Sequence, residues 1–289
     1  MKAELYIIKA ISNIHAGSGD INFDIIDKQV QRNHLGLPNI NSSSLKGAFR
    51  QHFEKQGQLT NYIFGPPNDG NNPHQTGAYS FFEAHLLTRP VRSNARPYYN
   101  AISTEVIEML LESIDDFCIA FDETTKMALE GMKALSLSKG SPVIFENLDD
   151  VKIENFTAKK NTTFEASKLE DFLGKNIALF HHEDYKNLSL PVLSRNHLDN
   201  GVSKNLWYEE VVPKQSKFYF VLGKPTNLDM TDRKKLENFD KKFDDIFDKI
   251  CAETDGSESA DEAEVEKIVQ IGANASIGYG YTRITKVSL

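Results

Sequence analysis

The alternation of apolar and polar residues predicts a strand at the start of the chain and a helix after it. Residues 2–14 alternate and are rich in Ile, Leu and Tyr, which indicates a first strand. The serine run 42–44 offers N-cap hydroxyls, and the helix that follows is expected to end near Gly57. One face of that helix has the spacing i, i+3, i+4, i+7 and i+8: Leu45, Ala48, Phe49, His52 and Phe53.

The middle of the chain has a weaker pattern. Residues 65–77 hold many turn-forming residues without periodicity, which predicts an exposed loop. Residues 78–87 indicate a strand, and residues 89–92 a connector rich in Pro and Arg. A helix is expected over 103–114 and a short strand over 151–156.

Three elements are predicted further on. Residues 206–213 and 218–222 indicate two strands, and residues 214–217 join them. Apolar residues then recur with helical spacing in a charged background, which predicts an amphipathic helix over about 230–252.

The end of the chain predicts a glycine-rich loop between two strands. Residues 268–271 and 281–287 have strand character, and residues 272–280 lie between them. Glycines allow the backbone N–H groups of such a loop to approach a ligand closely. No repeat of 20 to 50 residues is present in the sequence, which argues against a solenoid.

Composition favours a folded protein without membrane segments. At 289 residues and 40% apolar content, the chain is long enough for one large domain or two modest ones. No apolar run approaches the 18 or so residues that cross a bilayer, and a signal-peptide pattern is absent, so a cytoplasmic protein is expected. Cys118 and Cys251 lie far apart, which predicts core thiols rather than a disulfide or a thiolate zinc site.

Charge is distributed unevenly along the chain. Residues 253–266 contain seven acidic and no basic residues, so they account for seven of the eight net negative charges and predict a flexible solvated loop. Basic residues cluster elsewhere: Lys28, Arg32, Lys46 and Arg50, then Arg89, Arg92 and Arg96. A basic face, and with it a nucleic-acid partner, therefore remains compatible with the acidic total.

The segment from His15 to Arg50 gathers groups that suit a phosphate backbone. A glycine turn at 17–19 precedes the acidic loop residue Asp27. Lys46 and Arg50 fall on a polar face of the predicted helix, away from its apolar face. Free N–H groups and the dipole at a helix start favour an anion, so a phosphate contact is expected there.

Simpler interpretations stand beside these. A single loop carboxylate such as Asp27 is usually a turn or cap residue, and Asp24 is a competing candidate for chemistry. His15 precedes the Gly17 turn, and a histidine side chain can donate or accept a proton near neutral pH. A structural or RNA-contacting histidine is nevertheless the more common case. His181 and His182 are adjacent, and neighbours on a strand point to opposite faces, which argues against a metal pair.

Several motifs follow one another in a specific order: His15–Gly19, Asp27–Arg32, Pro38, Ser43–Arg50, Ile63–Pro66, Pro90–Ser93, Leu206–Glu210 and Gln270–Gly280. With these motifs the chain resembles the repeated backbone subunit of type III-B CRISPR effector complexes, the Cmr type of the RAMP superfamily. The first motifs are specific, whereas many RAMP proteins have a glycine-rich loop.

The resemblance implies an α+β fold. Its core is an RRM-like or ferredoxin-like palm with inserted helical elements and a thumb-like β-hairpin. On this basis residues 1–289 form a single RAMP-type domain. The palm is expected to be made of about 1–100 and 265–289, with the insertions and the thumb within about 101–225.

The resemblance also implies an activity, endoribonuclease cleavage of target RNA paired to a guide. Asp27 matches the aspartate that the family uses for this cleavage with a divalent metal, here expected to be Mg²⁺ held by Asp27. One carboxylate suits Mg²⁺, which keeps most of its waters. His15 is a second, weaker catalytic candidate.

The implied partners are guide (CRISPR) RNA, complementary target RNA, copies of the same chain in a helical stack and other subunits of the effector complex, with no membrane. The residues expected to bind RNA come from the first motifs and the glycine-rich loop: Gln31, Arg32, Ser43, Ser44, Lys46, Arg50, Gly272, Gly278 and Gly280.

Two other functions are compatible with the sequence. The chain is either a nuclease or a non-catalytic scaffold that coats guide RNA, and a type III-A backbone subunit is a further alternative. Glu209 and Glu210 match an acidic pair near the thumb of the family and are candidates to assist cleavage. Ala273 and Ala275 depart from the usual glycine-loop pattern, which weakens the expected RNA contact there.

Overall fold

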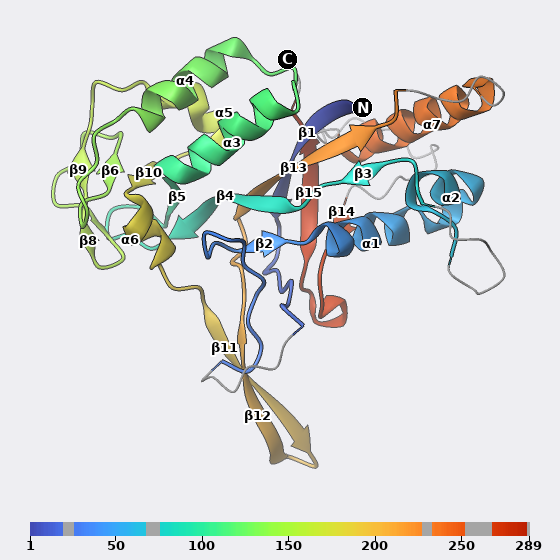
Figure 1. Ribbon diagram of the computed structural model, residues 1–289. Helices are drawn as coiled ribbons and strands as arrows, with labels where there is room; N and C mark the ends of the chain where they lie inside the picture. The colour runs from blue at the N-terminus through green and yellow to red at the C-terminus, as the bar shows by residue number, and fades with distance from the viewer. Residues whose placement is uncertain (20–25, 68–75, 227–232, 252–267, 288–289) are drawn as a thin grey trace, which may run out of the picture.

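The structure is a computed structural model that describes residues 1–19, 26–67, 76–226, 233–251 and 268–287 (Figure 1). Three features predicted from the sequence lie outside these ranges: Asp24, the acidic loop 253–266 and most of the loop 65–77. Within the described ranges, no helix has the length and apolar character needed to cross a membrane.

One large mixed sheet organises the chain, with the strand order β14-β15-β1-β13-β4-β5-β10-β6-β9. Its strands are β1 (Lys2–Ala10), β13 (Lys217–Lys224), β4 (Ala84–Val91), β5 (Tyr99–Ser103), β10 (Ile177–Phe180), β6 (Val143–Ile144), β9 (Lys159–Lys160), β14 (Ile268–Gln270) and β15 (Tyr281–Lys286). The short strands β2 (Asn39–Ile40) and β3 (Ser80–Phe81) pair with β4 and β13. β1 and β13 run antiparallel at its centre, and β5 pairs in parallel with β10.

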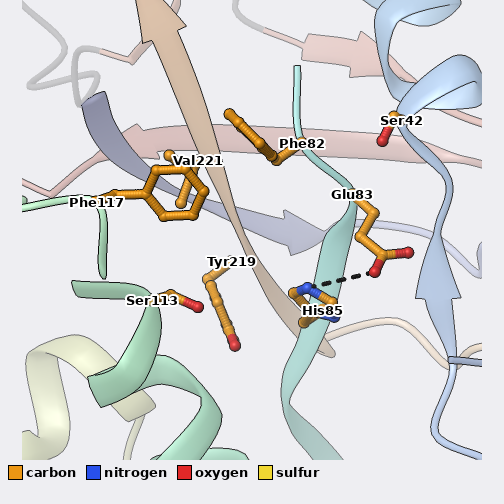
Figure 2. A pocket seen from close by; sticks show the side chains of 8 residues that line it. All are labelled: Ser42, Phe82, Glu83, His85, Ser113, Phe117, Tyr219 and Val221. Atoms are coloured by element: carbon orange, nitrogen blue, oxygen red, sulfur yellow. Dashed lines mark ion pairs between the residues drawn. The ribbon is translucent and has the colours of Figure 1, made fainter. Parts of the chain in front are cut away.

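Helices cover both faces of this sheet. They are α1 (Ser42–His52), α2 (Gln58–Phe64), α3 (Thr104–Asp116), α4 (Glu123–Lys133), α5 (Glu170–Leu173), α6 (His182–Lys186) and α7 (Arg233–Cys251), with short 3₁₀ turns at Glu54–Gln56, Ala166–Leu169 and Ala275–Ile277. Phe49 of α1 and Phe247 of α7 pack against each other and near Phe220 of β13. The neighbouring strand residue, Tyr219, points to the other face, where α3 lies (Figure 2).

A long β-hairpin projects from the body of the molecule (Figure 1). It consists of β11 (Val192–Asp199) and β12 (Val202–Glu210), paired from Val192↔Glu210 to Asp199↔Val202. Asn200 and Gly201 both have positive φ (49° and 80°), as an Asn-Gly hairpin turn requires. This hairpin has the thumb-like form that the resemblance implied.

The two strands predicted over residues 206–213 and 218–222 are present as β12 and β13, but they do not pair with each other. β12 pairs with β11, whereas β13 enters the central sheet between β1 and β4. The polar sequence of β11 hides its strand character, and only Asn200-Gly201 marks the turn.

Other boundaries also differ from the predictions. The proposed connector 89–92 is mostly strand, because β4 continues to Val91, and the strand 78–87 is split into β3 and β4. Residues 151–156 fall in two short strands, β7 (Lys152–Ile153) and β8 (Phe156–Thr157), which pair with each other.

Neither cysteine is the fully buried core thiol that was predicted. Cys118 is exposed just after α3, with a positive φ of 49°. Cys251 is only partly buried at the end of α7. Cys118 follows the last turn of a helix and so lies in a bend that turns its side chain to solvent.

Candidate functional site

Three segments that are far apart in the sequence meet at the base of the hairpin. The first motif runs beside the strand end, since Ile14 pairs with Val212 and Lys28 pairs with Glu209. The glycine-rich loop lies against the same motif, because Ala273 N–H donates to the His15 carbonyl at 3.0 Å. The hairpin base therefore joins the start and the end of the chain.

Asp27 is an exposed carboxylate at this junction. Its Oδ2 accepts a hydrogen bond from the backbone N–H of Tyr208 at 2.7 Å. No donor among the described residues contacts its other oxygen. Asp27 is thus held at the hairpin base through one oxygen, and its other oxygen has no partner among the described residues.

Glu209 is 1% exposed and surrounded by donors. Its Oε1 accepts from Asn274 Nδ2 at 2.6 Å, and its Oε2 accepts from Arg195 Nε at 3.2 Å. His15 Nε2 lies 3.8 Å from Oε1. A buried carboxylate requires such partners, so Glu209 ties the hairpin to both other segments.

Glu210 is also buried and bonded through each oxygen. Oε1 accepts from Arg32 Nη2 at 2.5 Å, and Oε2 accepts from the Val30 N–H at 3.1 Å. Its carbonyl accepts from His15 Nδ1 at 2.7 Å. The placement of Glu209 and Glu210 favours a positioning role and not the direct assistance in cleavage considered above, because their oxygens point into the protein.

His15 is held in the same network and is 5% exposed. Its two ring nitrogens face the Glu210 carbonyl and the Glu209 carboxylate. A Cβ atom on Gly17 would stand 3.0 Å from His15 Nε2, so the glycine turn leaves room for the ring. His15 therefore lies inside the junction and not on its surface.

Arg195 is the main site residue that the sequence did not reveal. Its guanidinium donates to the Tyr279 hydroxyl as well as to Glu209, and lies 4.8 Å from the centre of the Tyr279 ring. Burial raises the pKa of Tyr279. Recognising the Asn200-Gly201 turn would have placed Arg195 on the strand that pairs with β12, close to the acidic pair. A register shift between His197 and Leu198 then sets Trp207 as its partner.

At two positions of the glycine-rich loop, close neighbours leave no room for a Cβ atom, so packing requires glycine. A Cβ on Gly272 (φ 91°) would stand 2.6 Å from the His15 carbonyl oxygen, and one on Gly280 (φ 80°) 2.1 Å from that of Ile271. Gly278 (φ 85°) faces open space. Of the three predicted RNA-binding glycines, Gly278 and Gly272 are exposed and Gly280 is buried.

The start of α1 is more open than the hairpin base. Asn41, not the serine run, is the N-cap, and no side chain caps the helix, so the N-cap prediction for residues 42–44 is wrong. Ser43 and Ser44 are exposed in the first turn. Helices leave their first N–H groups without internal partners, and here no side chain fills that role.

The side chains around α1 that were predicted to bind RNA differ in whether other residues already contact them. Lys46 is half-buried and forms no hydrogen bond or ion pair with another described residue. Arg50 donates to the Gly65 carbonyl at 2.6 Å, which ties it to the end of α2. Gln31 is half-buried, and its backbone pairs with Ala16 and Asn39.

The second basic cluster is not a free basic face. Arg89 is 4% exposed within β4 and lies 5.5 Å from the ring centre of Tyr185. Arg92 pairs with Glu154 at 2.8 Å, and Arg96 pairs with Glu146. The strand pairing of β4 with β5 carries Arg89 inward, which the assignment to a connector did not anticipate.

No group of three or more His, Cys, Asp or Glu side chains in the described ranges is arranged to hold a metal. His181 and His182 are not on a strand: His181 caps α6, His182 begins it, and their rings stack at 4.3 Å. His182 Nδ1 lies 2.8 Å from Glu105. The argument that His181 and His182 lie on a strand and point to opposite faces is therefore wrong.

Comparison with known proteins places the chain in a family. The RAMP superfamily matches residues 7–283, so the chain belongs to the RAMP superfamily. Among curated relatives, the CRISPR system Cmr endoribonuclease Cmr4 of Pyrococcus furiosus is 25% identical over 99% of this chain and 96% of its own length. The CRISPR system CMR subunit Cmr4 of Saccharolobus solfataricus is 24% identical over 74% of this chain and 82% of its own.

Solved structures have the same fold. A chain of the type III-B Cmr-beta complex in the apo state superposes with a TM-score of 0.73 at 20% identity, covering 99% of this chain and 97% of the other. Oligomeric Cmr4 from Pyrococcus furiosus superposes with a TM-score of 0.67 at 19% identity over the full length of both. The α+β fold and the membership of the RAMP superfamily expected from the motifs are thereby confirmed.

Proposed function

We propose that this chain is a backbone subunit of a type III-B CRISPR effector complex, and that it binds guide RNA and cleaves complementary target RNA. The observation that carries the proposal is Asp27, an exposed carboxylate fixed at the base of the hairpin by the Tyr208 N–H at 2.7 Å. Full-length similarity to a relative named as an endoribonuclease supports the same activity.

Asp27 is positioned to act on a strand that crosses the hairpin base. Cleavage by the adjacent 2′-hydroxyl joins the 2′-oxygen to phosphorus and breaks the bond to the 5′-oxygen; the hydroxyl proton leaves and the 5′-oxygen takes one up. Water takes up that proton, because the oxygen of Asp27 that no described residue contacts is the one proposed to hold a metal ion. The hydrogen bond from Tyr208 limits the rotation of the side chain, which favours a fixed geometry.

Mg²⁺ belongs to this proposal as a cofactor held by Asp27. The donor set fits an ion that keeps several waters and takes one or two carboxylates, because Asp27 has one oxygen that no described residue contacts. Bound there with RNA phosphates, the ion would neutralise charge at the reacting phosphate. In nuclear magnetic resonance spectra, Mn²⁺ is expected to broaden signals around Asp27 and to lose this effect in the Asp27→Asn variant.

Guide RNA is proposed to contact the start of α1. The exposed hydroxyls of Ser43 and Ser44, the uncapped helix start and the side chain of Lys46 offer donors and positive charge to one phosphate. Because each copy would contact the next one head to tail along the guide, open helical stacks are expected and not closed dimers.

A scaffold without nuclease activity is the second candidate, and one observation favours it. The bond from Tyr208 to Asp27 gives this aspartate a structural role at the hairpin base. Under this alternative Asp27 orders the loop and cuts nothing. A type III-A subunit would differ in the complex it joins, and the subunits that co-purify with the chain distinguish these cases.

The test uses two variants of Asp27 in the assembled complex with guide RNA. Asp27→Asn keeps an oxygen that accepts the Tyr208 N–H but removes the charge, whereas Asp27→Ala removes both. Asp27→Asn is expected to bind guide and target normally and to cleave at least about 100-fold more slowly. Asp199→Asn, at the exposed tip of the hairpin, is the matched control and should cleave normally. Normal cleavage by Asp27→Asn would show that Asp27 is not the catalytic residue, and absence of cleavage by the wild-type complex would support the scaffold.

A further inference from the structure

A cavity of about 260 Å³ lies between α1, α3 and the strands β4 and β13, away from the hairpin base. Its lining is shown in Figure 2: Ser42, Phe82, Glu83, His85, Ser113, Phe117, Tyr219 and Val221. Water occupies about 30 Å³ per molecule in the liquid, so the volume of this cavity is larger than that of a few water molecules and suits a small organic group.

Aromatic rings belong to half of the lining residues. The rings of Phe82 and Phe117 meet edge to face at 4.6 Å, and those of His85 and Tyr219 are 5.4 Å apart. Tyr219 is 1% exposed, so it is a buried part of the lining. Faces of aromatic rings attract cations through their quadrupole.

Every polar side chain in the lining of this cavity can accept a hydrogen bond. Glu83 is the one charged acid in the lining, and no Lys or Arg contributes to it. The carboxylate takes one hydrogen bond, from Asn39 Nδ2 at 2.8 Å, and lies 3.7 Å from His85 Nε2. Burial lowers the pKa of His85, which favours the neutral ring, and a neutral imidazole has one acceptor nitrogen.

Three buried polar atoms at or beside the cavity have no hydrogen-bond partner among the described residues: Asn39 Oδ1, His85 Nδ1 and the Tyr219 hydroxyl. The neighbouring Ser113 hydroxyl gives its hydrogen to the Met109 carbonyl at 2.7 Å, so it can accept from the Tyr219 hydroxyl but has no hydrogen left to donate to the Tyr219 oxygen. Buried polar atoms without partners are uncommon and costly. A ligand rich in hydrogen-bond donors would satisfy them.

We propose that this cavity binds a guanidinium group. A guanidinium has five donors and no acceptor, it carries a positive charge, and its flat faces stack on aromatic rings. Each property matches the lining: unpaired acceptors, the Glu83 carboxylate and four aromatic side chains. Phosphate-bearing ligands are disfavoured because Glu83 repels them.

The test measures binding of methylguanidinium to the full chain by calorimetry and by nuclear magnetic resonance. Wild-type protein is expected to bind methylguanidinium more tightly than methylammonium, with shifts at lining residues. Glu83→Gln removes the charge but keeps an acceptor for Asn39, and should raise the Kd about tenfold, equivalent to about 1.4 kcal/mol. Tyr219→Phe keeps the ring and should raise the Kd about threefold, the loss of one hydrogen bond.

Controls separate binding from folding. Glu130→Gln, an exposed acid on α4, should leave the Kd unchanged, and all variants should retain the wild-type Tm within a few degrees. Absence of methylguanidinium binding to wild-type protein, or equal binding by Glu83→Gln, would overturn the proposal. Binding of cytidine monophosphate at the lining residues in place of methylguanidinium would also overturn it, in favour of a nucleobase site.

A further measurement identifies the source of the guanidinium. Sedimentation of the chain is compared in methylguanidinium chloride and in sodium chloride at equal ionic strength. If methylguanidinium dissociates associated chains, the natural occupant is an arginine side chain of a second copy. If the probe binds without changing sedimentation, the cavity takes a free guanidinium compound.

Discussion

The base of the hairpin and the start of α1 contain charged residues in very different settings. Glu209 and Glu210 are buried, and each carboxylate is bonded to a cation and to a further donor. Lys46, by contrast, forms no bond to a described residue and stands beside exposed Ser44. Charges at the hairpin base therefore hold the structure that positions Asp27, whereas the helix start keeps its charge available for an anion.

The largest expected effect is the loss of a buried carboxylate. Glu209→Ala leaves Arg195 and Asn274 without their acceptor, and should lower the free energy of unfolding by about 3 kcal/mol, as breaking a buried ion pair does. Urea denaturation followed by circular dichroism measures this. Glu130→Ala, on exposed α4, is the control and should change the free energy of unfolding by less than about 0.5 kcal/mol. Equal effects of the two variants would show that the network contributes little.

An intermediate effect is expected within the glycine-rich loop, where two glycines have similar φ but different surroundings. Gly278→Ala meets only the cost of the left-handed backbone, about 1 kcal/mol. Gly280→Ala also places a Cβ 2.1 Å from the Ile271 carbonyl oxygen and should cost about 2 kcal/mol more. Thermal unfolding of both variants tests whether packing, and not φ alone, requires glycine at position 280. Equal Tm values would refute that explanation.

The smallest effect on stability is expected at α1. Lys46→Met should change the free energy of unfolding by less than about 0.5 kcal/mol, because Lys46 bonds to no described residue. It should nevertheless reduce the slope of log K against log salt for single-stranded RNA by about 0.7, the value for one phosphate contact. Arg50→Met is the comparison: it should destabilise the fold by about 1 kcal/mol through the lost bond to Gly65, with a smaller change in salt slope. An unchanged slope for Lys46→Met would remove Lys46 from the RNA contact.

Much of the architecture could be predicted from local patterns. The apolar spacing of Leu45 and Phe49 marks the buried face of α1, and the helix predicted over 230–252 corresponds to α7. The hairpin strand β11 escaped prediction because its polar residues face solvent on a projecting element, so burial does not impose alternation on it. The Asn200-Gly201 turn was the available signal for this hairpin.

The sequence by itself determined the elements with strong periodicity, the motifs of a RAMP protein and the candidate aspartate, because these depend on neighbours in the chain or on motif order. Only the tertiary structure decided which charged side chains are bonded to other residues and which are open to a ligand. Glu209 meets Arg195, Asn274 and His15 from three separate segments, and no local pattern encodes that meeting. Burial, and with it the cost of an unpaired charge, arises only when those segments pack together.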